Sequence, residues 1–253
     1  MRDDARAPDP RCRRQHDARL ATPTTAPDAP LPPVVLFPDI GGLRPAYEVK
    51  AQRIADGGYA VLLPNVYYRD VAGPVSPEGR SFREPDLWAQ VSAYAGRLTP
   101  DALAGDFVAL LAGVDAAPEC AGRAGGGVAA IGYCMSGGFA LRMAARHPDR
   151  VVAAAGFHSA RLAPADDPHS PVSVVGSIRG RVYFGHADQD KSMPPDQIAR
   201  RDRALAEYGV HFTTELFRGA AHGFTATDSP AYDAAADALH FKRVFTLLEE
   251  TLR

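Results

Sequence analysis

The sequence predicts an α/β protein whose mainly parallel sheet carries helices on both faces. Two observations lead to this fold class. Six short apolar runs alternate with longer segments of helical periodicity, which is the pattern of successive βαβ units. Crossover connections in such units are right-handed and make the strands parallel. The chain of 253 residues is also long enough to bury apolar side chains on both faces of one sheet.

Each element has its own signal in the chain. The apolar runs predict strands at 34–37, 59–63, 126–131, 151–157, 181–184 and 211–217. Helices are expected between or after them, at 44–57, 101–116, 132–147, 195–208 and 231–252. Gly57 and Gly58 stop the first helix, and Pro64 stops the second strand. Residues 69–98 and 158–179 are interpreted as loops because proline and polar residues interrupt any apolar period there.

The first 33 residues differ from the rest of the chain. They hold seven of the 22 prolines and show no apolar periodicity. We therefore expect an irregular tail over 1–33, with room for a short strand around 18–21, followed by one domain over 34–253. The basic run Arg11-Cys12-Arg13-Arg14 within this tail is interpreted as solvated.

Composition excludes several classes of protein. The 28 basic and 30 acidic residues give a net charge of −2, which argues against binding to nucleic acid or an anionic membrane. No apolar stretch is long enough for a membrane span, and no secretory signal precedes the domain. Three cysteines cannot form a disulfide framework. We expect a cytoplasmic protein, monomeric or homodimeric, and the preference for arginine over lysine is typical of GC-rich bacterial genomes.

The third apolar run leads into Gly132-Tyr133-Cys134-Met135-Ser136-Gly137-Gly138 and then a helix. Strand, sharp turn and helix are the parts of a nucleophile elbow, here with cysteine at the apex. The helix N-terminus favours a thiolate and an oxyanion. Two alternatives remain open: Cys134 as a small buried residue, and Ser136 as the nucleophile. Cys12 and Cys120 lack this context and are expected to be inert.

An acid and a base follow later strands in the order that a catalytic triad needs. Asp188 and Asp190 follow the fifth run, and His222 follows the sixth in a loop of small residues. The order nucleophile, acid, base is that of α/β-hydrolases. Either aspartate could instead cap the next helix or stabilise a turn.

The remaining histidines have weaker signals. His186 lies near the acid, and His158 follows the fourth run, where it is a candidate to line the substrate pocket. Surface positions are expected for the others: His16, His147, His169, His211 and His240. No metal-ligand spacing and no phosphate-binding glycine loop follows a strand, so neither a metal nor a cofactor is expected.

These residues resemble the dienelactone hydrolase family of α/β-hydrolases over 34–253. The resemblance is carried by the elbow, by Asp190-Lys191-Ser192-Met193-Pro194 and by Ala221-His222-Gly223-Phe224. It implies an α/β-hydrolase fold and a Cys–His–Asp triad with Cys134 as nucleophile, His222 as base and Asp190 as acid. The family's acid precedes an apolar-Pro stretch, which favours Asp190 over Asp188.

The resemblance also assigns the surroundings of the triad. Asp39 stands where the family has a glutamate that contacts the thiol, and it is one methylene shorter. The Ile40 and Met135 N–H groups are implied as oxyanion donors, and Ser136 replaces a family glycine. For the arginines that hold a substrate carboxylate, four residues are candidates: Arg44, Arg69, Arg80 and Arg83. Tyr133 and His158 complete the expected pocket.

The implied activity is acyl transfer from a small ester or lactone to Cys134, followed by hydrolysis of the thioester. Two other functions remain open from the sequence. One is a general carboxylesterase or thioesterase without lactone preference. The other is a non-hydrolytic, redox-sensing thiol protein on the same scaffold.

Overall fold

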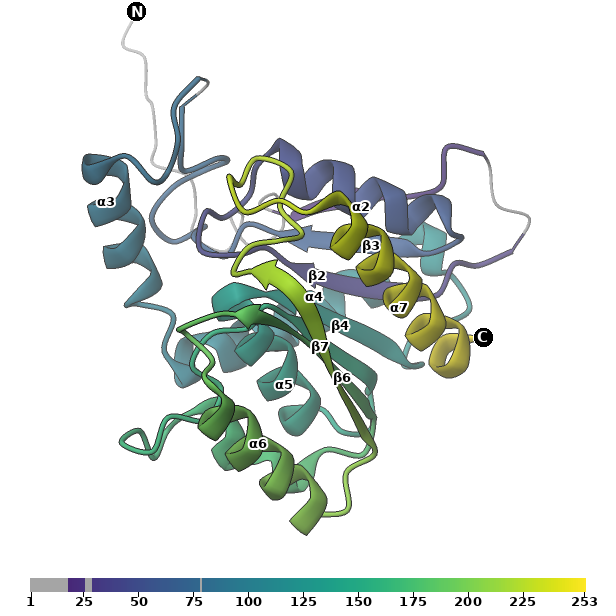
Figure 1. Cartoon of the computed structure of the whole chain (residues 1–253). Coiled ribbons are helices and arrows are strands. Elements are labelled where there is room, and N and C mark those ends of the chain that lie inside the picture. Colours follow the sequence, from purple (N-terminus) through teal and green to yellow (C-terminus); the bar gives the residue numbers. More distant parts are fainter. Residues whose placement is uncertain (1–17, 26–28, 78) are drawn as a thin grey trace, which may run out of the picture.

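Seven strands form one sheet in the order β1-β3-β2-β4-β5-β6-β7 in the computed structural model, which describes residues 18–25, 29–77 and 79–253 (Figure 1). Only β1 runs antiparallel to its neighbour. The strands are β1 (Ala18–Ala21), β2 (Pro33–Phe37), β3 (Ala60–Pro64), β4 (Val128–Tyr133), β5 (Val151–Phe157), β6 (Arg181–Gln189) and β7 (Phe212–Ala221). The predicted mainly parallel sheet is confirmed.

Helices cover both faces of this sheet, as predicted. One face carries α2 (Pro45–Asp56) and α7 (Ala234–Leu252), and the other carries α4 (Pro100–Ala116), α5 (Gly137–Arg146) and α6 (Pro195–Glu207) (Figure 1). Helix α3 (Pro85–Ala95) contributes Val91 to the core layer of α4 and α5. Three 3-10 helices complete the described elements: η1 (Pro118–Cys120), η2 (Cys134–Ser136) and η3 (Pro171–Ser177). No helix in the described part of the chain combines the length and apolarity that a membrane crossing requires.

Alternation along the strands divides the core into two layers. In β2, Val34 and Leu36 pack toward α2 and α7, whereas Val35 and Phe37 pack toward α4 and α5. All four side chains are at most 2% exposed. Burial on both faces explains why these strands are continuous apolar runs in the sequence.

The structure contains the short strand suggested at 18–21 and a helix that the sequence did not predict. The strand suggested at 18–21 is present and pairs with β3, so the sheet includes part of the predicted tail; the basic run at 11–14 lies outside the described residues. Helix α3 was missed inside the predicted loop 69–98. It begins at Pro85, a residue that ends many elements, and it buries only Leu87 and Val91, so its apolar period is weak.

Parallel register brings the functional loops to one edge. Phe37 pairs with Gly132, Tyr133 with Phe157, and Gln189 with Ala221. The segments after β2, β4, β6 and β7 therefore start side by side at the carboxyl end of the sheet, where ligands bind in open α/β folds.

Candidate active site

The turn after β4 has the geometry of a nucleophile elbow. Cys134 has a φ of 56°, a left-handed conformation that non-glycine residues rarely adopt and that often marks functional sites. A Cβ added to Gly132 would lie 2.7 Å from the Gly137 nitrogen and closer still to the Ser136 carbonyl group. Glycine is therefore required at position 132. The Cys134 thiol is free and partly exposed.

Ser136, the alternative nucleophile, is completely buried. Its hydroxyl accepts a hydrogen bond from the Tyr133 nitrogen at 2.9 Å and lies 3.0 Å from the Phe37 carbonyl oxygen. The hydroxyl thus joins the elbow to the end of β2. These contacts give Ser136 a structural role and argue against the alternative that the sequence left open.

His222 and Asp190 meet directly after β7 and β6. Nδ1 of His222 is 2.7 Å from Oδ2 of Asp190. The other carboxylate oxygen accepts hydrogen bonds from the Ser192 nitrogen and hydroxyl, at 2.8 and 2.6 Å. Both oxygens of Asp190 are therefore occupied, and its orientation is fixed. Asp188 lies within β6 and accepts a hydrogen bond from the Gly219 nitrogen at 2.9 Å instead.

The surroundings of His222 favour its protonated form. Burial opposes a charge on the imidazole, but hydrogen bonds to Asp190 and Cys134 raise the pKa of His222 to about 10. Burial would also raise the pKa of Asp190, but hydrogen bonds from His222 and Ser192 lower it below its ordinary value. At neutral pH Asp190 is ionised and His222 carries a proton. A cationic imidazole beside Cys134 favours the thiolate.

The loop after β2 carries Ile40, whose N–H was expected to be an oxyanion donor. Gly42, with a φ of 68°, donates from its nitrogen to the Asp39 carbonyl oxygen at 2.9 Å and closes a tight turn. The Tyr67 hydroxyl donates to the Ile40 carbonyl oxygen at 2.8 Å and lies 3.9 Å from the Met135 sulfur. Within the described residues the Ile40 N–H has no hydrogen-bond acceptor, so it is available to a ligand.

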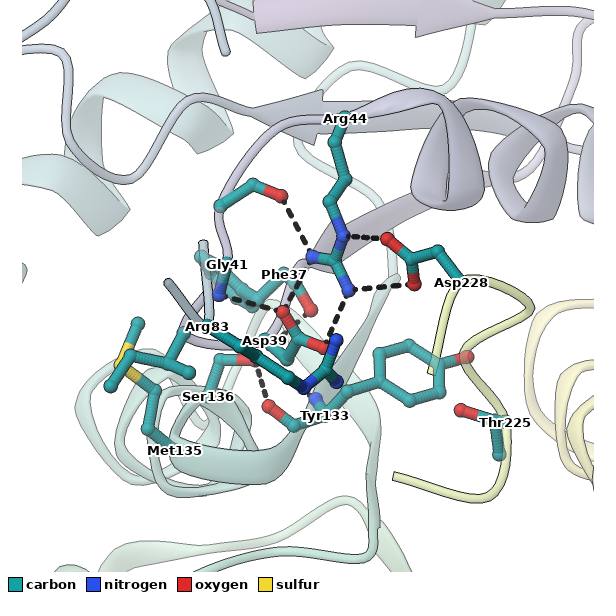
Figure 2. Close-up of polar contacts among 12 residues, drawn as sticks. Phe37, Asp39, Gly41, Arg44, Arg83, Tyr133, Met135, Ser136, Thr225 and Asp228 are labelled. Atoms are coloured by element: carbon teal, nitrogen blue, oxygen red, sulfur yellow. Dashed lines mark hydrogen bonds and ion pairs between the residues drawn. The ribbon is translucent and has the colours of Figure 1, made fainter. Parts of the chain in front are cut away.

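Asp39 is engaged by an arginine in this structure (Figure 2). Its carboxylate accepts hydrogen bonds from Arg44 at 2.6 and 2.9 Å and from the Gly41 nitrogen at 2.8 Å. The opposite edge of the Arg44 guanidinium binds Asp228, at 2.5 and 3.2 Å. Arg44 is only 6% exposed. The expected thiol contact of Asp39 therefore competes with an ion pair that uses both carboxylate oxygens.

His158 is a buried neighbour of His222. It has a φ of 37°, is fully buried, and its ring packs edge-to-face against His222 with 5.3 Å between centroids. Nε2 of His158 is 2.9 Å from the Thr225 hydroxyl, whose residue also accepts a hydrogen bond at its carbonyl oxygen from Lys50 at 2.7 Å. Burial and the nearby charges of His222 and Lys50 lower the pKa of His158 well below its ordinary value, which keeps it neutral.

Tyr133, another pocket candidate, lies in the core rather than at the site. Tyr133 is fully buried in the core, and its hydroxyl is 2.9 Å from Nε2 of His240. It is therefore a core residue rather than part of a pocket, and His240, expected at the surface, is also fully buried beneath it. His240 is buried because it lies on the face of α7 that packs against the sheet. His169 and His211 are exposed and His147 is half-buried, whereas His16 lies outside the described residues.

Two of the remaining candidate arginines, Arg69 and Arg80, already form ion pairs with carboxylates of the protein. Arg69 pairs with Asp106, and Arg80 pairs with Glu84 and Asp86. Arg83 is exposed and stacks on Phe82, with 4.4 Å between its guanidinium carbon and the ring centroid. Of the candidate arginines in the described chain, Arg83 alone has no carboxylate partner.

Cys120 and His186 lie away from the predicted chemistry. Cys120 is 1% exposed, and burial raises the pKa of its thiol; Cys12 is outside the described residues. His186 is buried and bonded to Arg201, and burial together with that cation lowers the pKa of His186 to about 3. No group of three potential ligand side chains within the described ranges is arranged to hold a metal ion.

Several residues near the site had no predicted role. Tyr67 and Ser192 orient the Ile40 carbonyl and the Asp190 carboxylate, while Thr225, Asp228 and Lys50 connect the loop after β7 to its surroundings. Tyr67 follows β3 at the carboxyl edge of the sheet, which was a usable signal. The others depend on partners that are distant in sequence.

Comparisons with known proteins agree with this architecture. The model of the dienelactone hydrolase family matches residues 16–252. The carboxymethylenebutenolidase of Pseudomonas putida is 26% identical over 221 residues, which cover 85% of this chain and 84% of that protein.

Two solved structures show the same fold. A dienelactone hydrolase-like promiscuous phosphotriesterase from metagenomic libraries has a TM-score of 0.70 at 23% identity, covering 93% of this chain and 98% of that chain. A dienelactone hydrolase from Anabaena variabilis ATCC 29413 has a TM-score of 0.64 at 16% identity, covering 93% and 92%. The chain therefore has the α/β-hydrolase fold that the sequence predicted.

Proposed function

Because the chain belongs to the dienelactone hydrolase family of carboxylic ester hydrolases, we propose that it cleaves small esters or lactones through a thioester on Cys134. His222 is the base and Asp190 orients it. The observation that carries this proposal is the position of His222, whose Nδ1 is 2.7 Å from Asp190 and whose imidazole interacts with Cys134 strongly enough to raise the pKa of His222. That arrangement of nucleophile, base and orienting acid is the general pattern of covalent acyl transfer.

The reaction begins from the sulfur beside the protonated His222. Cys134 attacks the carbonyl carbon, and the carbonyl oxygen takes the negative charge. The Met135 N–H, at the start of the helical turn, and the free Ile40 N–H stabilise this oxyanion; one such donor is commonly worth about 3 kcal/mol. When the tetrahedral adduct collapses, the C–O bond breaks and His222 gives its proton to the leaving alkoxide. In a lactone the alkoxide remains attached to the acyl group.

The second half of the reaction releases the acyl group. Neutral His222 takes a proton from water, the hydroxide attacks the thioester, and the C–S bond breaks to regenerate the Cys134 thiolate. Asp190 holds the proton on Nδ1 of His222, so Nε2 faces the reacting atoms. The short connection between β5 and β6 contains only η3 and no lid domain, which favours small substrates. The name of the Pseudomonas putida relative, a carboxymethylenebutenolidase, supports a lactone among them.

The experiment measures p-nitrophenolate release from a short-chain aryl ester by the wild type and by Cys134→Ala. Cys120→Ala is the matched control, because it removes a buried thiol remote from the elbow. We expect turnover to be lost in Cys134→Ala and retained in Cys120→Ala. A panel of lactones then separates lactone preference from general esterase activity.

Two outcomes would contradict the proposal. Equal turnover by wild type and Cys134→Ala would remove the thiol from catalysis. Absence of turnover on every ester and lactone, together with rapid reversible oxidation of Cys134, would favour the redox alternative.

A further inference from the structure

We propose that Arg44 is a positioning residue that ties the loop carrying the oxyanion donor to the loop carrying His222. It does so through Asp39 on one side and Asp228 on the other (Figure 2). The roles of the two loops rest on the proposed function. The link between them rests on contacts alone.

The Arg44 guanidinium is fully used by these partners. One edge binds both oxygens of Asp39, the other edge binds both oxygens of Asp228, and Nη1 also lies 3.3 Å from the Gly42 carbonyl oxygen. The planar, forked donor geometry of arginine fits two carboxylates at once, which lysine cannot do. No edge of Arg44 is left for a substrate carboxylate, so its role as a pocket candidate is replaced by a role inside the protein.

Arg44 is itself held firmly. It immediately precedes Pro45, the first residue of α2, and its guanidinium stacks on Tyr47 at 4.8 Å and on Phe82 at 5.0 Å. Its side chain is 7% exposed. The pair with Asp39, whose side chain is also 7% exposed, is screened far less than a surface salt bridge, whereas Asp228 is 41% exposed. Arg44 is thus anchored to a rigid helix and sets where both loops lie.

On the oxyanion side, Arg44 binds Asp39, which is the residue next to Ile40 and its proposed oxyanion donor. Asp39 Oδ1 accepts hydrogen bonds from both Arg44 and the Gly41 nitrogen, which brackets Ile40 between two fixed points. The Ile40 carbonyl is fixed in turn by Tyr67. Arg44 also neutralises Asp39, whose charge would otherwise repel an oxyanion forming at the next residue.

On the histidine side, the contact reaches His222 through a compact loop. Backbone hydrogen bonds join Phe224 to Ala221 at 3.1 Å, Ala226 to Gly223 at 3.0 Å and Ser229 to Ala226 at 2.9 Å. These successive turns transmit a shift at Asp228 toward His222. Asp228 and Arg44 are 184 residues apart in sequence, so the ion pair joins segments that no local structure connects.

The experiment compares Arg44→Met, Arg44→Lys and Asp228→Asn with Arg150→Met. Arg150 is the matched control because it also binds a carboxylate through two nitrogens, Asp115 at 2.8 and 3.1 Å, but it precedes β5 at the opposite end of the sheet. Hydrogen–deuterium exchange is followed in peptides covering 38–46 and 222–233. Ester turnover and Cys134 alkylation by iodoacetamide are measured in parallel.

We expect exchange in both peptides to rise about tenfold or more in Arg44→Met and Asp228→Asn, and in neither peptide in Arg150→Met. Turnover by Arg44→Met should fall about tenfold or more in kcat with little change in KM, because oxyanion geometry is lost while the thiolate remains. Arg44→Lys keeps the charge and should recover only part of the rate. Alkylation needs no oxyanion donor and depends only on the pairing of Cys134 with His222, which Asp190 also holds, so alkylation should fall by less than turnover.

The proposal is overturned if exchange rises in only one peptide or in neither, or if turnover is unchanged when both loops are loosened. Asp228→Asn keeps the size of a half-exposed side chain, so it decides the question if Arg44→Met does not fold. Absence of turnover in the wild type would contradict the proposed function, whereas the exchange result would still decide whether Arg44 links the loops.

Discussion

Replacing Gly132 by alanine tests whether the elbow has room for any side chain. The added Cβ would lie 2.7 Å from the Gly137 nitrogen and closer to the Ser136 carbonyl group, whereas ordinary contact begins near 3.4 Å. The elbow would have to open by about 0.7 Å or more. These neighbours are backbone atoms, which cannot move aside as a flexible side chain can.

Opening the elbow has two costs. Overpacking costs about 1–3 kcal/mol. Displacing Ser136 also breaks its buried hydrogen bonds to Tyr133 and Phe37, which costs about 1–3 kcal/mol more. We therefore expect Gly132→Ala to lower the free energy of unfolding by about 2–6 kcal/mol, and to slow Cys134 alkylation because Cys134 moves with the turn.

Urea unfolding and the rate of iodoacetamide alkylation measure these two effects. Gly105→Ala is the control, because Gly105 lies in α4 with nothing within 4 Å of an added Cβ, and alanine there should stabilise by about 0.5–1 kcal/mol. If Gly132→Ala unfolds at the wild-type urea concentration and its thiol reacts at the wild-type rate, the close approach of strand and helix is not required.

Three further predictions concern buried polar groups. Ser136→Ala should lower the free energy of unfolding by about 1–3 kcal/mol in urea while leaving ester turnover nearly unchanged; abolished turnover in a folded variant would restore Ser136 as nucleophile. Asp190→Asn removes one of the partners that raise the pKa of His222 to about 10, so the titration of the His222 imidazole, followed by NMR, should move to lower pH, and an unmoved titration would contradict the pairing. Burial and Lys50 lower the pKa of His240 from 6.5 to about 4. As pH falls, His240 therefore takes up a proton at a higher pH in the unfolded chain than in the folded chain, and the free energy of unfolding decreases between pH 6.5 and about 4. His240→Gln should therefore move acid unfolding, followed by circular dichroism, to lower pH, and an unchanged midpoint would show that His240 does not contribute.

Local patterns in the sequence were sufficient for most of the fold. The alternation of Val34, Val35, Leu36 and Phe37 does not by itself distinguish strand from helix, but the proline and glycine residues around such runs do. Helix α3 was missed because only two of its residues are buried. His240 was misplaced because one histidine on an amphipathic helix gives no sign of which face it occupies.

The candidate site was predictable where residues follow strands and not where they depend on distant partners. Cys134, Asp190 and His222 are recognised because parallel strands bring their ends together. The pairing of Arg44 with Asp228 has no local signal, since it depends on how α2 and the loop after β7 approach in three dimensions. The same holds for Thr225, which meets Lys50 and His158 from opposite sides.

The strand order also determines when during folding such a site can exist. Residues far apart in sequence meet where β2 pairs with β4 and where Arg44 binds Asp228. Folds rich in such long-range contacts form slowly. His222 follows the last strand, so a nascent chain that ends before β7 has the elbow but lacks His222. Recovery of rapid Cys134 alkylation during refolding should consequently coincide with the docking of β7 and α7, which makes thiol reactivity a kinetic marker for the completion of the sheet.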